Sequence, residues 1–197
     1  MYPWFNPSAE ALPVRYTFAS LAVFSTILLV AAFVLGLVIE DAKSPDPAAL
    51  AQVRNHFLTG AAGLVFGALV HAIVLTYFMG TGRWIEETSH AYRLDAAWRA
   101  ENHKLKYRTV GGMMVCLILL ILTGAFGAAA DPASAVGFQG WFGLSAATIH
   151  LIVAAATLCA NAVVNFWEFQ AIDRNGEIVN GVVDQVRRIR QERGLPV

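Results

Sequence analysis

The sequence predicts an all-α integral membrane protein, built as a four-helix transmembrane bundle. The 197-residue chain is 57% hydrophobic and 14% charged, whereas charged residues make up about a quarter of an ordinary soluble domain. Four continuous apolar stretches are long enough to cross a hydrocarbon core of about 30 Å. Helices are predicted rather than a β-barrel because the apolar runs do not alternate with polar residues. We place the spans at residues 16–39, 57–82, 110–130 and 141–167, in one domain covering residues 1–170.

The distribution of cations predicts the orientation of these spans. With the N-terminus inside, every lysine and arginine except Lys43 and Arg54 lies on the cytoplasmic side, as the positive-inside rule requires. The predicted topology is therefore N-in and C-in, and it suits a bacterial inner membrane. Span 16–39 is expected to be a retained helix, since no positive cluster precedes Arg15 and no clear cleavage site follows. The net charge of zero gives no indication of a nucleic-acid partner.

The second span contains a histidine with glycines on its face. At about 100° per residue, Gly60 lies about 20° from His71, Gly67 about 40° and Gly63 about 80°. This side of the helix is a shallow groove that ends at an imidazole. It fits a neighbouring helix that packs through small residues, or a flat ring such as haem or quinone.

The fourth span contains the other intramembrane histidine, His150. Small and polar residues share its face at helical spacing: Gly143, Ala147, Ala154, Thr157 and Asn161. Because polar groups that face lipid are costly, both histidine-bearing faces are expected to point into the bundle and to approach a shared centre. Counting along the two helices places His71 and His150 about 10 Å apart in depth.

The main hypothesis is that His71 and His150 ligate the iron of a single haem b between the second and fourth spans. Gly67 and Ala147 would leave room for the macrocycle, and Thr157 would set the imidazole hydrogen bonds. Such a subunit would pass electrons between a quinone and a partner, and would not itself be an enzyme.

The alternative hypothesis is a cofactor-free structural or scaffolding subunit of a larger membrane complex. In that case each histidine forms a hydrogen bond across helices, and the glycine and alanine stripes let neighbouring helices or subunits approach. A second haem is not expected, because four intramembrane ligands would be needed.

Residues 83–108 lack proline and glycine, and predict a cytoplasmic hairpin of two helical extensions joined near Leu94-Asp95. Glu87 and His90 have the Glu-x-x-His spacing of di-iron bundles, which use it twice. It occurs here once, so a charged solvent face is the expectation and a membrane metalloenzyme is the third hypothesis.

The three remaining histidines, His56, His90 and His103, are expected to be solvated at the membrane interfaces. If the bundle were shifted, His56 would approach the outer haem edge or a quinone headgroup, and His103 would do so on the inner side.

The tail, residues 171–197, is predicted to be a separate amphipathic basic helix. Ile178, Val179, Val182, Val183, Val186 and Ile189 lie toward one side, and Arg187, Arg188, Arg190 and Arg193 lie near the end. Such a helix would rest on anionic membrane lipid or dock on a cytoplasmic partner.

Overall fold

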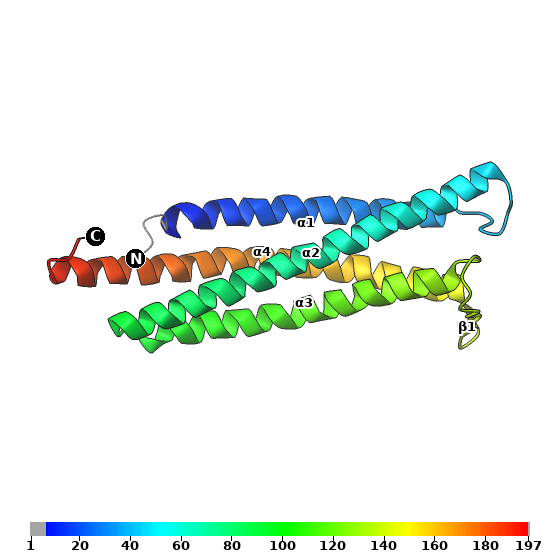
Figure 1. Ribbon diagram of the computed structural model, residues 1–197. Coiled ribbons are helices and arrows are strands. Elements are labelled where there is room, and N and C mark those ends of the chain that lie inside the picture. Colours follow the sequence, from blue (N-terminus) through cyan, green and yellow to red (C-terminus); the bar gives the residue numbers. More distant parts are fainter. Residues whose placement is uncertain (1–6, 197) are drawn as a thin grey trace. The chain divides into compact units, whose positions relative to one another are not determined.

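The computed structural model describes residues 7–196, which form four long α-helices and one short β-hairpin (Figure 1). The helices are α1 (Pro7–Leu37), α2 (Pro47–Tyr92), α3 (Ala96–Ala130) and α4 (Ala146–Glu192). The strands β1 (Gly140–Trp141) and β2 (Leu144–Ser145) pair antiparallel between α3 and α4. All four helices are long and apolar enough to cross a membrane. The predicted all-α class is therefore confirmed, with four helices that are long and apolar enough to span a membrane, while the N-in, C-in orientation and the cytoplasmic hairpin stay predictions.

Three of the helices begin at a side chain that caps the first turn. Asp46 Oδ2 accepts hydrogen bonds from the backbone N–H groups of the second and third residues after it, and Pro47 occupies the first helical position of α2. At the start of α3 Asp95 Oδ1 accepts one such bond, from the N–H of Ala97, and at the start of α4 Ser145 Oγ accepts one from the N–H of Thr148. These contacts satisfy N–H groups that the helix itself leaves unpaired. The helix starts are thus encoded locally.

The fourth span begins later than predicted. Trp141, the predicted first residue of that span, lies in β1, and Phe142 and Gly143 have φ angles of +54° and +80°. These left-handed conformations are incompatible with a continuing α-helix. Helix α4 therefore starts at Ala146, five residues after the predicted boundary.

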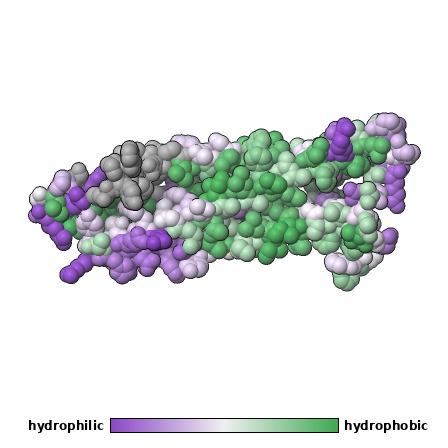
Figure 2. Space-filling view, in the orientation of Figure 1, coloured by the Kyte–Doolittle hydropathy of each residue, from purple (hydrophilic) through white to green (hydrophobic). Residues whose placement is uncertain are grey.

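The tail also differs from the prediction. Helix α4 continues without a break to Glu192, so residues 171–192 extend the fourth spanning helix rather than form a separate one. In Figure 2, hydrophobic residues lie over the middle of the helices and hydrophilic residues gather toward the helix ends. This is the pattern expected of helices that span a membrane and continue beyond it.

The chain divides into two compact units. Unit 1 comprises Met1–Ser20, Ala72–Gly112 and Phe166–Val197, and unit 2 comprises Leu21–His71 and Met113–Asn165. Unit 2 therefore contains the α1–α2 and α3–α4 connections. Unit 1 contains the α2–α3 turn and the C-terminal part of α4.

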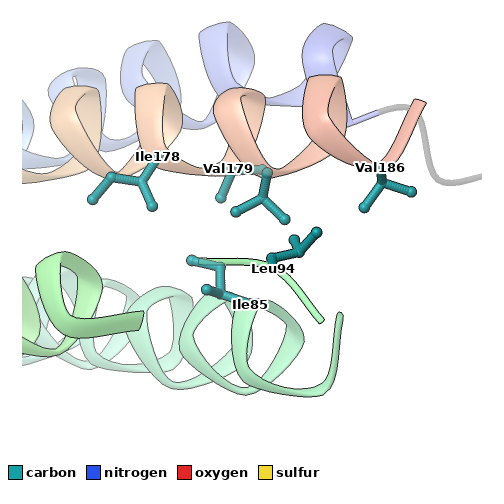
Figure 3. Packing of buried hydrophobic residues seen from close by; sticks show 6 residues of the cluster. Ile85, Leu94, Ile178, Val179 and Val186 are labelled. Atoms are coloured by element: carbon teal, nitrogen blue, oxygen red, sulfur yellow. The ribbon is translucent and has the colours of Figure 1, made fainter. Parts of the chain in front are cut away.

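The core of unit 1 is an apolar cluster between the end of α4 and the α2–α3 turn (Figure 3). Its buried members are Ile85, Leu94, Ile178, Val179, Val182 and Val186. The apolar side of the tail thus packs on the chain's own hairpin. This side is not available to anionic lipid or to a partner, and that part of the tail prediction is corrected. The hydrophobic effect explains the outcome, because burying these side chains stabilises the hairpin and the tail together.

Buried amides also link the helices of unit 1. Asn102 Nδ2 donates to Asn175 Oδ1 at 2.7 Å, and Asn175 Nδ2 donates to Thr81 Oγ1 at 2.9 Å, which joins α3, α4 and α2. At Gly181 an added Cβ would lie 2.4 Å from the Trp98 ring, so α4 approaches α3 as closely as a glycine allows. These contacts fix the register of the hairpin against the tail.

The helices of unit 2 pack closely at glycines. A Cβ added at Gly63 would lie 3.3 Å from the backbone nitrogen of Leu29 on α1, and one at Gly67 would lie 3.2 Å from Leu120 on α3. The groove beside His71 is therefore filled by the neighbouring helices. At Gly67 the Leu120 side chain of α3 occupies the space that the sequence predicts for a macrocycle.

Candidate functional site

His71 lies in the core of unit 2 and is committed to a hydrogen bond. Its side chain is 1% exposed, and its Nε2 lies 3.0 Å from Asn161 Oδ1 on α4. Asn161 Nδ2 donates to the Thr157 carbonyl at 2.9 Å, which leaves Oδ1 as the accepting atom. His71 Nε2 therefore carries the proton and donates it. A nitrogen that holds a proton in this way is not a metal ligand.

The structure does not bring His71 to His150. Asn161, the partner of His71, lies eleven residues after His150 on the same helix, which corresponds to about 16 Å at 1.5 Å per residue. Two imidazole nitrogens that share one metal at about 2 Å each lie only about 4 Å apart. In this structure His71 therefore lies too far from His150, measured along α4, for the two imidazoles to share one metal.

His150 lies instead beside a glycine of the preceding helix. A Cβ added at Gly127 on α3 would be 3.0 Å from His150 Cε1, so the imidazole rests directly on the α3 backbone. Nδ1 is buried and has no partner with hydrogen-bond geometry among the described residues. The ring is half-buried, close to the start of α4.

His56 has the same environment on the other helix pair. A Cβ added at Gly36 on α1 would be 2.9 Å from His56 Cε1, and His56 Nδ1 lies 2.9 Å from the carbonyl oxygen of Ala32, four residues before that glycine. Because a carbonyl can only accept, Nδ1 carries the proton and the Nε2 lone pair is available. Each histidine thus lies on a glycine of the preceding helix.

These two histidines are neighbours. The ring centroids of His56 on α2 and His150 on α4 lie 6.0 Å apart, with an angle of 77° between the ring planes. Two imidazoles bound to one metal at about 2 Å per bond would have ring centres about 6 Å apart. The pair therefore has the spacing of two ligands on opposite sides of one ion. One turn from each histidine stand small residues, namely Gly60, Ala146, Ala147 and Ala154.

The composition of the site restricts the kind of metal group it fits. Zinc and other free first-row ions take three or more protein ligands. Within residues 7–196 no group of three histidine, cysteine, aspartate or glutamate side chains could hold an ion. Haem needs only axial ligands, because the macrocycle supplies the remaining nitrogens. Two imidazoles flanked by small side chains therefore fit haem better than a free ion.

The other predicted site residues have structural roles. Thr157 Oγ1 lies 2.6 Å from Thr123 Oγ1 and donates to the Val153 carbonyl, so its hydroxyl makes no contact with an imidazole. The Thr157 carbonyl holds the amide that binds His71, and its influence on that ring is indirect. Ala147 is exposed and lies one turn before His150 on α4.

Sequence reasoning missed the role of His56 and expected it to be solvated. A signal was present, because the chain contains glycine and then histidine at similar separations in its two helix pairs. Gly36 precedes His56 by 20 residues, and Gly127 precedes His150 by 23 residues. In two antiparallel helix pairs, such spacings place each histidine at the level of its glycine.

The polar groups of the hairpin in unit 1 are engaged with arginines. Glu87 accepts a hydrogen bond from Arg83 Nε at 2.8 Å, and His90 Nε2 accepts one from Arg99 at 3.0 Å. The Glu-x-x-His pair is therefore held by cations, and the metalloenzyme hypothesis gains no support from its geometry.

Ion pairs continue around Arg174 on the same unit. Hydrogen bonds to Glu101 and then to Glu177 raise the pKa of the Arg174 guanidinium above its ordinary value. His103 stacks on Tyr107 with ring centroids 4.4 Å apart, on the exposed side of α3. These groups form a charged surface, as the sequence indicated.

Comparison of the chain with protein-family models, with curated proteins and with solved structures finds no match.

Proposed function

We propose that this protein is a small integral membrane subunit of an electron-transfer complex, and that His56 and His150 hold a single haem b between α2 and α4. The observation that carries the proposal is the pair of imidazoles with centroids 6.0 Å apart, each lying on a backbone glycine. The proposal keeps the cofactor and the helix pair inferred from the sequence. It replaces His71 with His56.

The chain prepares His56 for metal binding. The Ala32 carbonyl holds the proton of His56 on Nδ1, which leaves the Nε2 lone pair available to a metal. Haem, when bound, supplies reversible one-electron transfer, and carbonyl partners of this kind lower its reduction potential by increasing electron donation from the ligands.

The position of the pair along the helices suggests where electrons enter or leave. Both histidines lie near the helix ends that adjoin the α1–α2 and α3–α4 connections. In the N-in, C-in topology of a bacterial inner membrane, this is the outer side. A quinone headgroup or an external redox protein would exchange electrons there. The exposed tail arginines Arg188 and Arg193, on a helix that is held by its apolar side, would contact anionic lipid or a cytoplasmic partner.

A second candidate function is a cofactor-free structural subunit, and the hydrogen bond between His71 and Asn161 favours it. This contact and the packing of Gly63 and Gly67 bind the helices together without any cofactor. The glycine and alanine stripes would then serve only to pack the helices against one another, and the exposed apolar surface would contact other membrane subunits.

A haem-content assay of the purified full-length protein separates the two candidates. We expect one haem b per chain, with sharp bands on reduction. His56→Ala and His150→Ala should each lower the haem content, and His71→Ala, the matched control, should retain it in the fraction that folds. A colourless wild-type protein that copurifies with a large complex would support the structural subunit. Loss of haem in His71→Ala alone would overturn the assignment of His56.

A further inference from the structure

The tip of the β-hairpin carries an aromatic residue in a strained conformation. Phe142 and Gly143 form the two-residue turn between β1 and β2, with φ angles of +54° and +80°. Such turns favour Asn-Gly or Gly-Gly, because a side chain at positive φ crowds its own backbone. The Phe142 side chain is 100% exposed, so no packing within unit 2 compensates for the strain. Strain retained at an exposed tip indicates a function.

Aromatic contacts hold the β1–β2 hairpin on α3 of unit 2. The Trp141 ring packs edge-on against Phe126 of α3 and against Phe138, with centroid distances of 5.7 Å and 5.2 Å. Gly140, at a φ of +121°, approaches the Leu144 carbonyl so closely that a Cβ would lie 1.9 Å from that oxygen. The base of the hairpin thus fixes where its tip points.

The surroundings of the tip are apolar and uncharged. From residue 132 to residue 167 the sequence contains no aspartate, glutamate, lysine or arginine. Val136, Trp141 and Leu144 are all exposed near the tip. The connection between α1 and α2, also in unit 2, contrasts with this, since it carries Glu40, Asp41, Lys43 and Asp46. Only the α1–α2 connection has the charged composition that is typical of a solvent-exposed segment.

The uncharged segment is continuous with helix surface that faces lipid. At the adjoining ends of the spans, Ile121 and Leu122 of α3 and Leu151 and Ile152 of α4 are exposed, as lipid-facing residues are. Only five residues lie between Gly140, the start of β1, and Ala146, the first residue of α4. Aromatic side chains at this level of a spanning protein partition into the headgroup region.

We propose that the β1–β2 turn inserts Phe142 into the lipid interface and anchors the α3–α4 connection on the membrane surface. The ligand is the boundary between phospholipid headgroups and acyl chains, not a protein. The exposed ring gains burial in lipid that it lacks in the isolated chain. The left-handed backbone aims it outward. This proposal rests on the membrane-spanning character of the helices and is independent of haem binding.

Spin labels on the full-length protein in phosphatidylcholine vesicles test the proposal. One label is placed by Phe142→Cys and a matched one by Ala42→Cys in the charged connection, both with the exposed Cys159 replaced by alanine. We expect the label at position 142 to collide with oxygen, which concentrates in lipid, and to be shielded from a water-soluble nickel chelate. The label at position 42 should behave in the opposite way. Equal access of the nickel chelate to both positions would overturn the proposal.

The unsubstituted protein provides a second measurement, in case a labelled variant fails to fold. Vesicles that contain a photoactivatable phosphatidylcholine are irradiated, and lipid adducts are mapped by mass spectrometry. We expect adducts within residues 136–144 and none within residues 40–46. Adducts confined to the helices, with none in the hairpin, would contradict lipid insertion and would point to a protein partner or to water at the tip.

Discussion

The contact between His150 and the α3 backbone makes a quantitative prediction for Gly127→Ala. The new Cβ would lie 3.0 Å from His150 Cε1, so the imidazole must move by about half an ångström to reach ordinary van der Waals contact. Overpacking of this kind costs about 1–3 kcal/mol. Replacing a helical glycine by alanine also stabilises a helix by about 1 kcal/mol, which partly masks the cost.

A matched control on the same helix removes that complication. A Cβ added at Gly111 meets no atom within 4 Å, so Gly111→Ala gains helix propensity without a clash. The difference between the two variants then reports the overpacking alone. For a difference of about 2 kcal/mol in the free energy of unfolding, Gly127→Ala should melt roughly 4–8 °C below Gly111→Ala.

Thermal unfolding of both variants in one detergent, followed by circular dichroism, measures this difference. A melting temperature of Gly127→Ala equal to or above that of Gly111→Ala would refute the close seating of His150 on α3. Such a result would also contradict the inference that Gly36 and Gly127 position the two imidazoles.

Three further substitutions test other contacts by the same unfolding measurement. Asn161→Leu removes the hydrogen bond between the buried His71 Nε2 and Asn161 Oδ1 and should destabilise the protein by about 1–3 kcal/mol; an unchanged melting temperature would show that the hydrogen bond contributes nothing. Gly181→Ala should destabilise it by at least about 2 kcal/mol, because the Cβ would lie 2.4 Å from the Trp98 ring, and a stable variant would contradict that close approach. Phe142→Asn should stabilise the protein in detergent by about 1 kcal/mol, since asparagine tolerates positive φ; a lower melting temperature would argue against backbone strain at the tip.

The four spans could be predicted from the sequence because membrane-spanning helices are determined by the length of apolar runs. Their ends depended on other information. The sequence predicts the start of α4 too early because Trp141 and Phe142 look like the beginning of an apolar run. The positive φ angles of Phe142 and Gly143 become evident only once the β1–β2 hairpin is known. The burial of the tail could not be predicted either, since an amphipathic helix has the same sequence pattern whether its apolar side meets lipid or the α2–α3 turn of the same chain.

The candidate site was predicted in part, and the physical reason lies in helix register. The sequence placed His150 and the second helix at the site but selected His71, which is central in its span. His56 lies one residue before the predicted span, so it was assigned to water. The depth of His56 relative to His150 depends on the register of α2 against α4. Counting residues from the predicted helix ends does not resolve this register, because each end is uncertain by a few residues. The glycine partners Gly36 and Gly127 supply the missing constraint once the helix pairs are known.

Electron paramagnetic resonance of the purified ferric protein tests the central claim most directly, because it reports how many strong axial ligands the iron has. The wild type and His71→Ala should both give a low-spin signal of haem held by two imidazoles. His56→Ala and His150→Ala should each convert the signal to high spin or lose the haem. A low-spin signal that survives in His56→Ala but disappears in His71→Ala would contradict the account.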